Sequence, residues 1–329
     1  MHGTLVIPDD ATRATETVVD PGTDTLAARL AAGKPFWLDL DTTDANALVA
    51  LRDTFSFHPL AVEDAEHFGQ RPKIDPYDGF AFVVTFGVTA DCIPIEVHCF
   101  YAEHFLVTVH HGAVPELDAA ITRLVARALP LPAPIMLLQR VIDTLVDGYF
   151  PVLDAMDEAI DALEDSILRR PTDAQLGELF ELKRKLVTLR RLASEQRDMF
   201  GSAMPGDDVL PGMTPEVERY FRDVYDHLVR ISQSADSYRD LLSSVLDTHL
   251  STTSNRLNVV MKQLAIIATV FLPMSFLTGF FGQNFAWMVN RIGGSWMFWI
   301  AGVGLQVLVA GGLLMMFRRK GWLGADADH

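Results

Sequence analysis

Two long stretches without a charged side chain near the C-terminus constrain this chain more than any other feature. No Asp, Glu, Lys or Arg lies between Lys262 and Arg291, nor between Arg291 and Arg318. Each stretch is longer than the roughly 20 residues that a helix needs to cross a bilayer core of about 30 Å. The sequence therefore predicts a membrane hairpin, with spans from about Leu257 to Phe281 and from Trp296 to Phe317.

Basic residues flank the two spans on one side of the hairpin. Arg256 and Lys262 stand at the start of the first span, and Arg318-Arg319-Lys320 follows the second. Because Lys and Arg beside a span stay in the cytoplasm, we expect a multi-pass protein of the cell (inner) membrane with both termini cytoplasmic. The first residues, MHGTLVIPDD, have no basic start and no long apolar run, so no cleaved signal peptide is expected.

The composition separates an acidic body from an apolar end. The 329 residues are 49 % hydrophobic, with a mean hydropathy of +0.19, and yet carry a net charge of −16. Only two acids, Asp326 and Asp328, follow Lys262, so the negative charge lies before the membrane spans. An acidic body disfavours nucleic acid, whose phosphates require basic surfaces, and it favours cations as partners.

The sequence lacks the motifs of most enzymes and of structural metal sites. Cys92 and Cys99 are the only cysteines and form no CxxC pair, so neither a disulfide framework nor a structural zinc site is indicated. No P-loop, nucleophile elbow, HExxH motif or Rossmann glycine run occurs. In a strand, His110 and His111 point to opposite faces and would not easily share a metal. We therefore expect neither an enzyme nor a nucleotide site.

Residues 1–130 are predicted to form a cytoplasmic α/β domain. The predicted strands are Phe36–Leu40, Phe80–Val88, Ile95–Tyr101 and Phe105–His110, and the predicted helices are Asp44–Thr54 and Pro115–Ala128. The breakers Pro130, Pro132 and Pro134 mark the end of this domain.

Residues 131–255 are predicted to form long cytoplasmic helices that include a stalk. Residues 143–165 contain eight acids and no base, a pattern typical of a solvated helix face or of a surface that concentrates cations. Arg169-Arg170-Pro171 indicates a chain reversal before a helix at Ala174–Phe200.

The stalk is the most unusual of these helices. The 57 residues from Glu216 to Leu272 contain no Pro or Gly, which permits a continuous helix of roughly 85 Å that enters the membrane. Its apolar positions step by three and four, which predicts packing against other helices or self-association around an axis. These positions are Val217, Tyr220, Val224, Leu228, Ile231, Ala235, Tyr238, Leu242 and Val245.

A short motif at the outer end of the first span carries a family resemblance. Phe281-Gly282-Gln283-Asn284-Phe285 resembles the Tyr-Gly-Met-Asn-Phe signature of the CorA family of divalent-cation channels. The flanks of both spans resemble the family too, and further matches run in the expected order from His58 to Leu323. They are His58-Pro59-Leu60, Glu63-Asp64, Arg71-Pro72-Lys73 and the run from Phe221 to His227.

The resemblance implies an architecture and a function. The fold is an α+β cytoplasmic domain plus long stalk helices and a two-helix transmembrane hairpin at 256–320, with the signature loop at 282–295 and a cytoplasmic tail at 321–329. Five such chains would form a funnel-shaped homopentamer in membrane lipids, without nucleic acid or nucleotide. The expected function is influx of Mg²⁺, with Co²⁺ and Ni²⁺ as further cargo, gated by cytoplasmic metal bound between subunits.

The resemblance also assigns roles to individual residues. Gly282, Gln283 and Asn284, which we call the mouth residues, would form the selectivity mouth, where carboxamide oxygens accept hydrogen bonds from the water shell of an arriving ion. One helix face would line the pore, with apolar rings that block ions by dewetting. The residues of this pore face are Asn258, Met261, Leu264, Ala268, Leu272, Ser275 and Gly279.

An inter-subunit regulatory metal site is expected in the cytoplasm. The resemblance carries Asp223 over as one ligand, and we assign Asp91, in a turn between two predicted strands, as its partner. Mg²⁺ would then be both transported and regulatory, and Zn²⁺ or Co²⁺ are further cations for such sites. Carboxylates crowded at an interface repel each other until a cation neutralises them, so metal loss would loosen the closed state.

Two departures from the signature leave the transported ion open. Gln283 replaces the signature methionine, and residues 285–295 contain no acid and one base, Arg291. Two alternatives therefore stand beside the Mg²⁺ channel. One is a ZntB-like proton-coupled Zn²⁺ transporter, and the other is a non-conducting, membrane-anchored cation sensor.

Overall fold

The computed structural model describes residues 2–8, 14–126, 130–203, 210–283, 286–291 and 294–322. The chain divides into two compact units, Met1–Leu246 and Asp247–His329. The division falls inside one helix, α8 (Pro215–Phe281), which contributes residues to both units.

A seven-stranded sheet forms the centre of the first unit, in the order β2-β1-β3-β7-β6-β5-β4. Only the neighbours β3 and β7 are parallel, and every other pair is antiparallel. The strands are β1 (Gly3–Pro8), β2 (Thr15–Val19), β3 (Phe36–Asp41), β4 (Lys73–Tyr77), β5 (Phe80–Val88), β6 (Pro94–Tyr101) and β7 (Phe105–His110).

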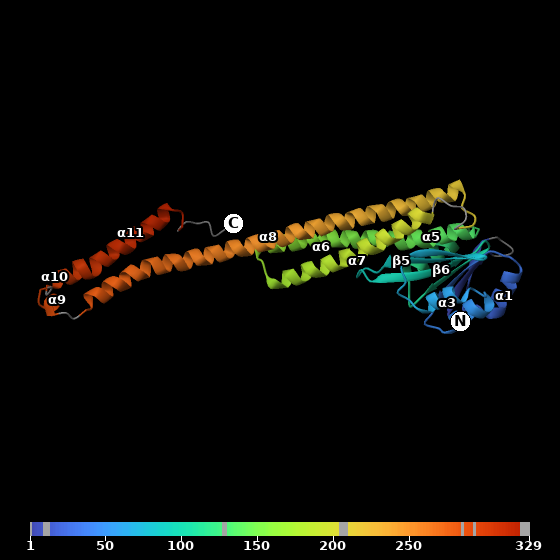
Figure 1. Cartoon of the computed structure of the whole chain (residues 1–329), viewed down its shortest axis with the longest axis horizontal. Coiled ribbons are helices and arrows are strands. Elements are labelled where there is room, and N and C mark those ends of the chain that lie inside the picture. The colour runs from blue at the N-terminus through green and yellow to red at the C-terminus, as the bar shows by residue number, and fades with distance from the viewer. Residues whose placement is uncertain are drawn as a thin grey trace. The chain divides into compact units, whose positions relative to one another are not determined.

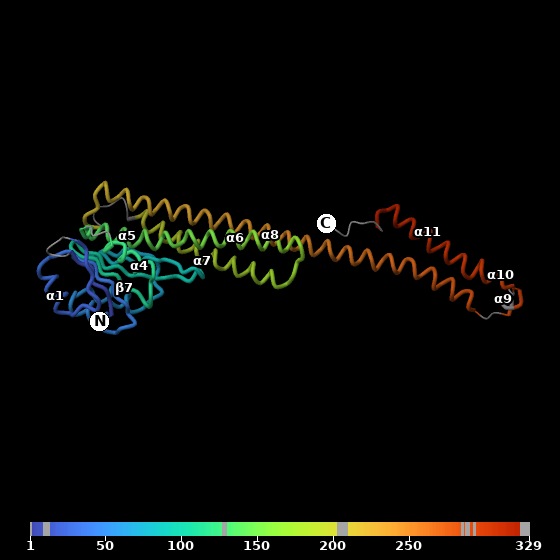
Figure 2. The backbone as a smooth tube through the Cα atoms, turned by 180° about the vertical axis from the view of Figure 1, so that it is seen from behind, coloured from blue at the N-terminus to red at the C-terminus, as the bar shows by residue number. Residues whose placement is uncertain are grey.

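Helices cover both faces of the central strands. Figure 1 shows α5 (Pro134–Asp147) along one face and α1 (Thr23–Ala31) and α3 (Pro59–Glu66) at the other, and Figure 2 shows the same arrangement from behind, with α4 (Pro115–Ala126) beside α5. Between α1 and α3 lie the short α2 (Asn46–Val49) and the π-helical segment η1 (Ala50–Thr54). Every residue of β5 is buried, as expected for a strand covered on both faces.

Two of the sequence matches have a local structural role at α3. The Nδ1 of His58 accepts a hydrogen bond from the Leu60 N–H at 3.3 Å, and Pro59 occupies the first turn, so this pair caps the helix. Asp64, near the end of α3, forms an ion pair with Lys73 of β4 at 2.6 Å. These contacts join α3 to the edge of the sheet.

Gln196 joins α7 (Asp173–Ala203) to the sheet. Its Oε1 accepts hydrogen bonds from the Thr85 hydroxyl at 2.8 Å and from the Phe86 N–H at 2.9 Å. Its Nε2 donates to the Phe86 carbonyl at 3.1 Å and to the Tyr149 hydroxyl at 3.2 Å. Because β4 pairs with β5 only as far as Val84, the buried side chain of Gln196 replaces the missing strand at Phe86.

We predict that Gln196→Leu destabilises the protein by about 2–4 kcal/mol, because it leaves the buried Phe86 N–H and the buried Thr85 hydroxyl without their acceptor. Thermal or denaturant unfolding of the detergent-solubilised full chain measures the change. Gln233→Leu, at an exposed position of α8, is the matched control. Equal stability of the two variants would contradict the proposed role of Gln196.

A buried charge network links β3 to β7. The Nε2 of His110 lies 3.2 Å from Asp39 Oδ2, and its Nδ1 lies 2.6 Å from the Gly112 carbonyl oxygen. Both ring nitrogens therefore lie beside oxygen atoms that can accept, an arrangement that favours the doubly protonated imidazolium. Thr108 donates to the other oxygen of Asp39 and accepts from the Trp37 indole at 2.9 Å.

The pKa of His110 reports this arrangement. Burial disfavours the imidazolium, but the hydrogen bond and charge of Asp39, with the Gly112 carbonyl and the charge of Asp41, outweigh it and raise the pKa above 6.5. Asp39, Asp41, Asp118 and His2 are the other titratable groups around the adjoining cavity of about 170 Å³. His110 therefore stabilises the fold while it is protonated.

We predict that the His110 contribution to stability is fully present below pH 6.5 and is lost as the pH rises through the raised pKa. Unfolding midpoints measured from pH 6 to pH 9 should fall more steeply for the wild type than for His110→Gln. His104→Gln, at an exposed position, should keep the wild-type slope. Identical slopes for the wild type and His110→Gln would exclude the imidazolium assignment.

The three long helices of the first unit pack through an apolar seam. Helix α6 (Tyr149–Arg169) turns back into α7, and the side chain of Gln175 closes that turn by accepting from Thr172 N–H at 2.7 Å and donating to Ser166 Oγ at 2.9 Å. Arg190 of α7 pairs with Asp236 of α8 at 2.6 Å. Seven of the nine predicted seam positions are buried, whereas Tyr220 is 47 % exposed and Tyr238 is half-buried.

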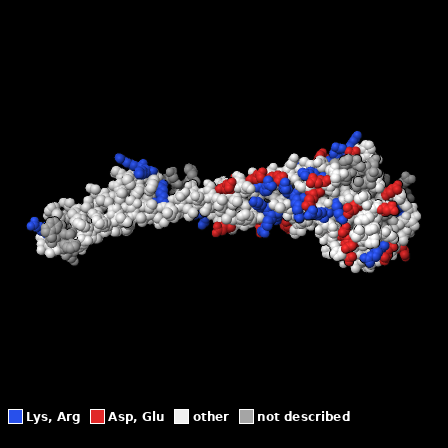
Figure 3. All heavy atoms as spheres, in the orientation of Figure 1, with Lys and Arg blue, Asp and Glu red and all other residues white. Residues whose placement is uncertain are grey.

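The second unit consists of helices without charge over most of their length. The last part of α8 and the helix of residues Ser295–Arg319 are long and apolar enough to cross a membrane. The latter comprises α10 (Ser295–Met297), the π-helical segment η2 (Phe298–Gly304) and α11 (Leu305–Arg319). Figure 3 shows a nearly uncharged surface over these helices, whereas charged residues cover the first unit. Pro273 lies inside α8, as spanning helices tolerate.

The structure confirms most of the predicted elements. The strands β5 and β7 begin and end at the predicted residues, and the reversal lies between α6 and α7. The sequence reading missed β1, β2, α1, α3 and β4. It was also wrong to treat 282–295 as a loop throughout, because α9 (Ala286–Arg291) forms there.

Candidate functional site

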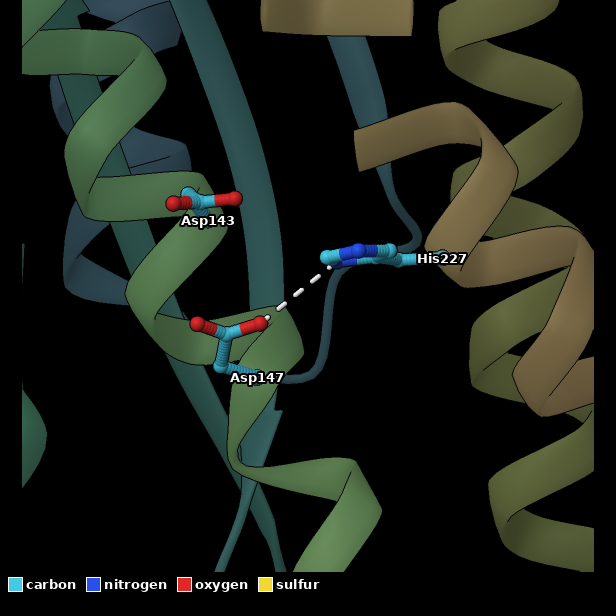
Figure 4. Close-up of side chains that lie close together, drawn as sticks. All are labelled: Asp143, Asp147 and His227. Atoms are coloured by element: carbon cyan, nitrogen blue, oxygen red, sulfur yellow. Dashed lines mark ion pairs between the residues drawn. The ribbon is translucent and has the colours of Figure 1, made fainter. Parts of the chain in front are cut away.

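Three side chains that prefer metal ions meet between α5 and α8. Asp143 and Asp147 lie four residues apart on one face of α5, and His227 projects from α8 toward them (Figure 4). One ligand atom of each lies within 4.8 Å of the others. We call these residues the metal triad, and it is the one such group of three or more in the part of the chain that the structure describes.

Packing and charge hold His227 in place. Its Nδ1 lies 3.5 Å from Asp147 Oδ1, and its Nε2 lies 3.8 Å from Asp223 Oδ2, one turn earlier on α8. Its ring and that of Phe150 form a T-shaped pair, with the ring centroids 5.4 Å apart. The Nδ1 atom is buried and, apart from its ion-pair contact with Asp147, makes no hydrogen bond within the described ranges, so a metal bound beside Asp147 could use it as a ligand.

The charges around Asp143 favour a bound cation. Burial raises the pKa of Asp143, and the carboxylates of Asp147 and Asp223 raise it further, although His227 and Arg140 act in the opposite direction. Three carboxylates near one another repel when ionised. A divalent cation would remove both the desolvation cost and the repulsion.

The donor set fits divalent metals. Carboxylate oxygens suit Mg²⁺, which keeps several of its own waters. An imidazole nitrogen suits Co²⁺, Ni²⁺ and Zn²⁺ better than Mg²⁺. The triad therefore fits either kind of ion, with water completing the coordination.

The sequence analysis named Asp223 as a metal ligand, which stays a prediction, and did not name Asp143, Asp147 or His227 as ligands. Asp223 lies beside the triad with its side chain 66 % exposed. Asp91 is exposed in the turn between β5 and β6, and the structure shows no contact between it and Asp223 within the described part of the chain. The signal for the missed residues was the i, i+4 spacing of Asp143 and Asp147 in the acidic run and of Asp223 and His227 in the stalk.

The mouth residues follow the end of α8. The Gly282 N–H donates to the Thr278 carbonyl at 2.9 Å, and the Gln283 N–H donates to the Phe280 carbonyl at 3.3 Å, so both continue the last helical turn. Both are exposed. Asn284 lies outside the described residues.

All residues of the pore face lie on α8 and are exposed in the single chain. The exposed fractions of Met261, Leu264 and Leu272 are 65 %, 57 % and 73 %. Residues on other faces, such as Phe271 and Phe276, are equally exposed at 66 % and 68 %. Exposure in the single chain therefore does not separate the pore face from the other faces of α8, and the pore assignment, which comes from the family resemblance, stays a prediction.

The chain combines an α/β unit that carries the metal triad with a long helix and two apolar helices, the first of which ends beside Gly282 and Gln283. These features are typical of two-span membrane proteins that bind or transport cations. The chain belongs to the CorA-like Mg²⁺ transporter protein family, whose model matches residues 33–319. This is a family of ion transporters and not of enzymes.

Individual relatives agree with this assignment. The chain is 32 % identical over 300 residues to the cobalt/magnesium transport protein CorA of Thermotoga maritima, covering 88 % of this chain and 84 % of that protein. It is 25 % identical over 258 residues to the zinc transport protein ZntB of Yersinia enterocolitica, covering 77 % and 78 %. The structure of CorA from Methanocaldococcus jannaschii covers 98 % of this chain and 99 % of its own, with a TM-score of 0.83 at 17 % identity, and so shows the same fold.

We predict that Asp147→Asn weakens Co²⁺ binding to the detergent-solubilised protein at least about tenfold, because it removes a charged ligand of the triad. Calorimetry and the visible absorption of bound Co²⁺ measure the change. Asp154→Asn, an exposed acid of α6, is the control. Unchanged Co²⁺ affinity in Asp147→Asn would show that the triad binds no metal.

Proposed function

We propose that this protein is a Mg²⁺ influx channel that works as a homopentamer in the inner membrane, with both termini cytoplasmic. The observation that carries the proposal is the Gly282-Gln283-Asn284 sequence at the end of an apolar helix in a chain of the CorA-like family. The basic residues at the cytoplasmic ends, Lys262 and Arg318 to Lys320, support the orientation.

Carboxamide side chains suit a mouth that binds an ion through its hydration shell. Mg²⁺ gives up its waters reluctantly, so a ring of Asn284 side chains would accept hydrogen bonds from those waters instead of replacing them. Gln283 would add a second carboxamide per subunit. Below the mouth, Ser275 supplies a hydroxyl, and Met261, Leu264 and Leu272 supply apolar rings that close the pore by dewetting.

Cytoplasmic metal binding would set the state of this pore. Asp223 and Asp91 are the proposed ligands between subunits, and the metal triad adjoins Asp223 within one subunit. With metal bound, the carboxylates are neutralised and the closed assembly is favoured. Without metal, their repulsion shifts the population toward an open state.

The membrane potential would drive the flux. No nucleotide-binding motif occurs in the sequence. An interior-negative potential of 100 mV contributes roughly 4.6 kcal/mol for two charges that move inward. Residues 263–290 and 295–317 contain no Asp, Glu, His, Lys or Arg, so the spans offer no titratable side chain for a proton relay.

A proton-coupled Zn²⁺ transporter is the second candidate. The imidazole of His227 in the triad and the similarity to ZntB favour it. The absence of titratable side chains from the two spans opposes it. A non-conducting cation sensor is the third candidate, favoured by an outer loop that contains no acid.

We predict that Asn284→Ala abolishes Mg²⁺ uptake into proteoliposomes, because it removes the carboxamide ring, and that the pentamer persists. Asn290→Ala, in α9 of the same outer segment, is the control and should retain uptake. Uptake of Mg²⁺, Co²⁺, Ni²⁺ and Zn²⁺ is measured with and without an inward proton gradient. Wild-type flux in Asn284→Ala would exclude the proposed filter.

The wild-type results separate the three candidates. Mg²⁺ uptake that follows voltage and ignores protons supports the channel. Zn²⁺ uptake stimulated by protons supports the ZntB-like transporter. No uptake of any ion, together with metal-dependent conformational change, supports the sensor.

A further inference from the structure

A polar contact joins the two apolar helices of the second unit. The Nε2 of Gln306 in α11 donates a hydrogen bond to the Thr278 hydroxyl oxygen in α8 at 2.9 Å. The Thr278 hydroxyl in turn donates to the Met274 carbonyl at 2.9 Å. The hydroxyl therefore uses its proton on its own helix and its lone pair on the neighbouring helix.

The composition of the second span makes this contact unusual. Between Phe298 and Phe317, Gln306 is the only side chain besides the Trp299 indole that carries a hydrogen-bonding nitrogen or oxygen. A carboxamide in hydrocarbon has no water to bind, so a partner on the adjacent helix is favoured. A leucine at this position would suit the lipid better and form no contact of this kind.

Thr278 also contacts the first of the mouth residues, Gly282, through its backbone. Its backbone carbonyl accepts the Gly282 N–H at 2.9 Å. It directly precedes Gly279 and lies three residues after Ser275, both on the pore face. A contact that fixes the Thr278 side chain therefore also restrains the last turn of α8 and the first mouth residues.

The backbone of the second span helps Gln306 to face Thr278. The π-helical segment η2 ends at Gly304, two residues before Gln306. A π-helical turn contains more residues than an α-helical one and so changes which side chains face a neighbouring helix. A Cβ at Gly304 would lie 3.2 Å from the Trp299 carbonyl oxygen, which favours glycine at the end of this segment.

We propose that Gln306 is a positioning residue that holds the outer end of α8, through Thr278, in the orientation that the mouth requires for conduction. The inference rests on the proposed channel function. Gln306 itself does not touch the ion; it fixes the last helical turn, and thereby the mouth residues that follow.

The test is a double-mutant cycle with Gln306→Leu, Thr278→Val and the combined variant in proteoliposomes. Each single variant should lower the maximal Mg²⁺ uptake rate about threefold to tenfold and change the ratio of Mg²⁺ to Co²⁺ uptake. The combined variant should be no worse than either single one, because both remove the same bond. Thr278→Ser keeps the hydroxyl and should restore wild-type uptake.

Thr269→Val is the matched control, since Thr269 lies in the same span and makes no hydrogen bond to α11 among the described residues. Light scattering after gel filtration confirms that every variant has the oligomeric state of the wild type. Thr278→Val replaces a hydroxyl by a methyl group of similar size, so it tests the contact even if Gln306→Leu fails to assemble. Additive losses, or wild-type rates and ion ratios in Thr278→Val, would overturn the proposal.

Hydrogen exchange separates this inference from the proposed function. The amides of residues 279–283 should exchange faster in Thr278→Val and Gln306→Leu than in the wild type or Thr269→Val. If wild-type protein conducts no ion, the channel proposal fails while this comparison still tests the contact. If the wild type conducts and exchange at 279–283 is the same in all variants, the positioning role is excluded.

Discussion

The uninterrupted helix α8 is the constraint on which the rest of the structure depends. Its 67 residues span about 100 Å at 1.5 Å per residue, and they include Asp223 and His227 near one end and the pore face near the other. A membrane-spanning segment must satisfy all of its backbone hydrogen bonds internally. The same continuous hydrogen bonding that permits the helix to enter the membrane therefore joins, in one element, the proposed metal-binding residues and the proposed pore face.

The charges around Asp143 would make the contact between α5 and α8 depend on a bound cation. Asp143, Asp147 and Asp223 share a region in which burial and mutual repulsion raise the pKa of Asp143. A metal ion relieves that repulsion, and its loss restores it. In the proposed channel, metal bound at this region would hold α8 against α5 and metal loss would weaken that contact, as negative feedback on influx requires.

The sequence predicted local and repetitive features best. Charge-free stretches marked the spans, the absence of Pro and Gly marked the stalk, and continuous apolar runs marked β5 and β7. It failed where the local signal was weak. Strand β4 contains Pro76, which is tolerated because β4 is an edge strand, and β2 is an edge strand with four exposed residues. Neither shows the apolar pattern by which strands are recognised.

The chain sequence by itself determined the two spans, the acidic body, the stalk and the signature beside the first span, because each depends on residues close together in the chain. Only the tertiary structure decided which distant residues meet. Asp143 and His227 are far apart in sequence, as are Thr278 and Gln306, and Thr85 and Gln196. Their contacts depend on helix rotation and packing, to which no local pattern is sensitive, so the sequence indicated Asp223 as a candidate metal ligand but not the triad beside it.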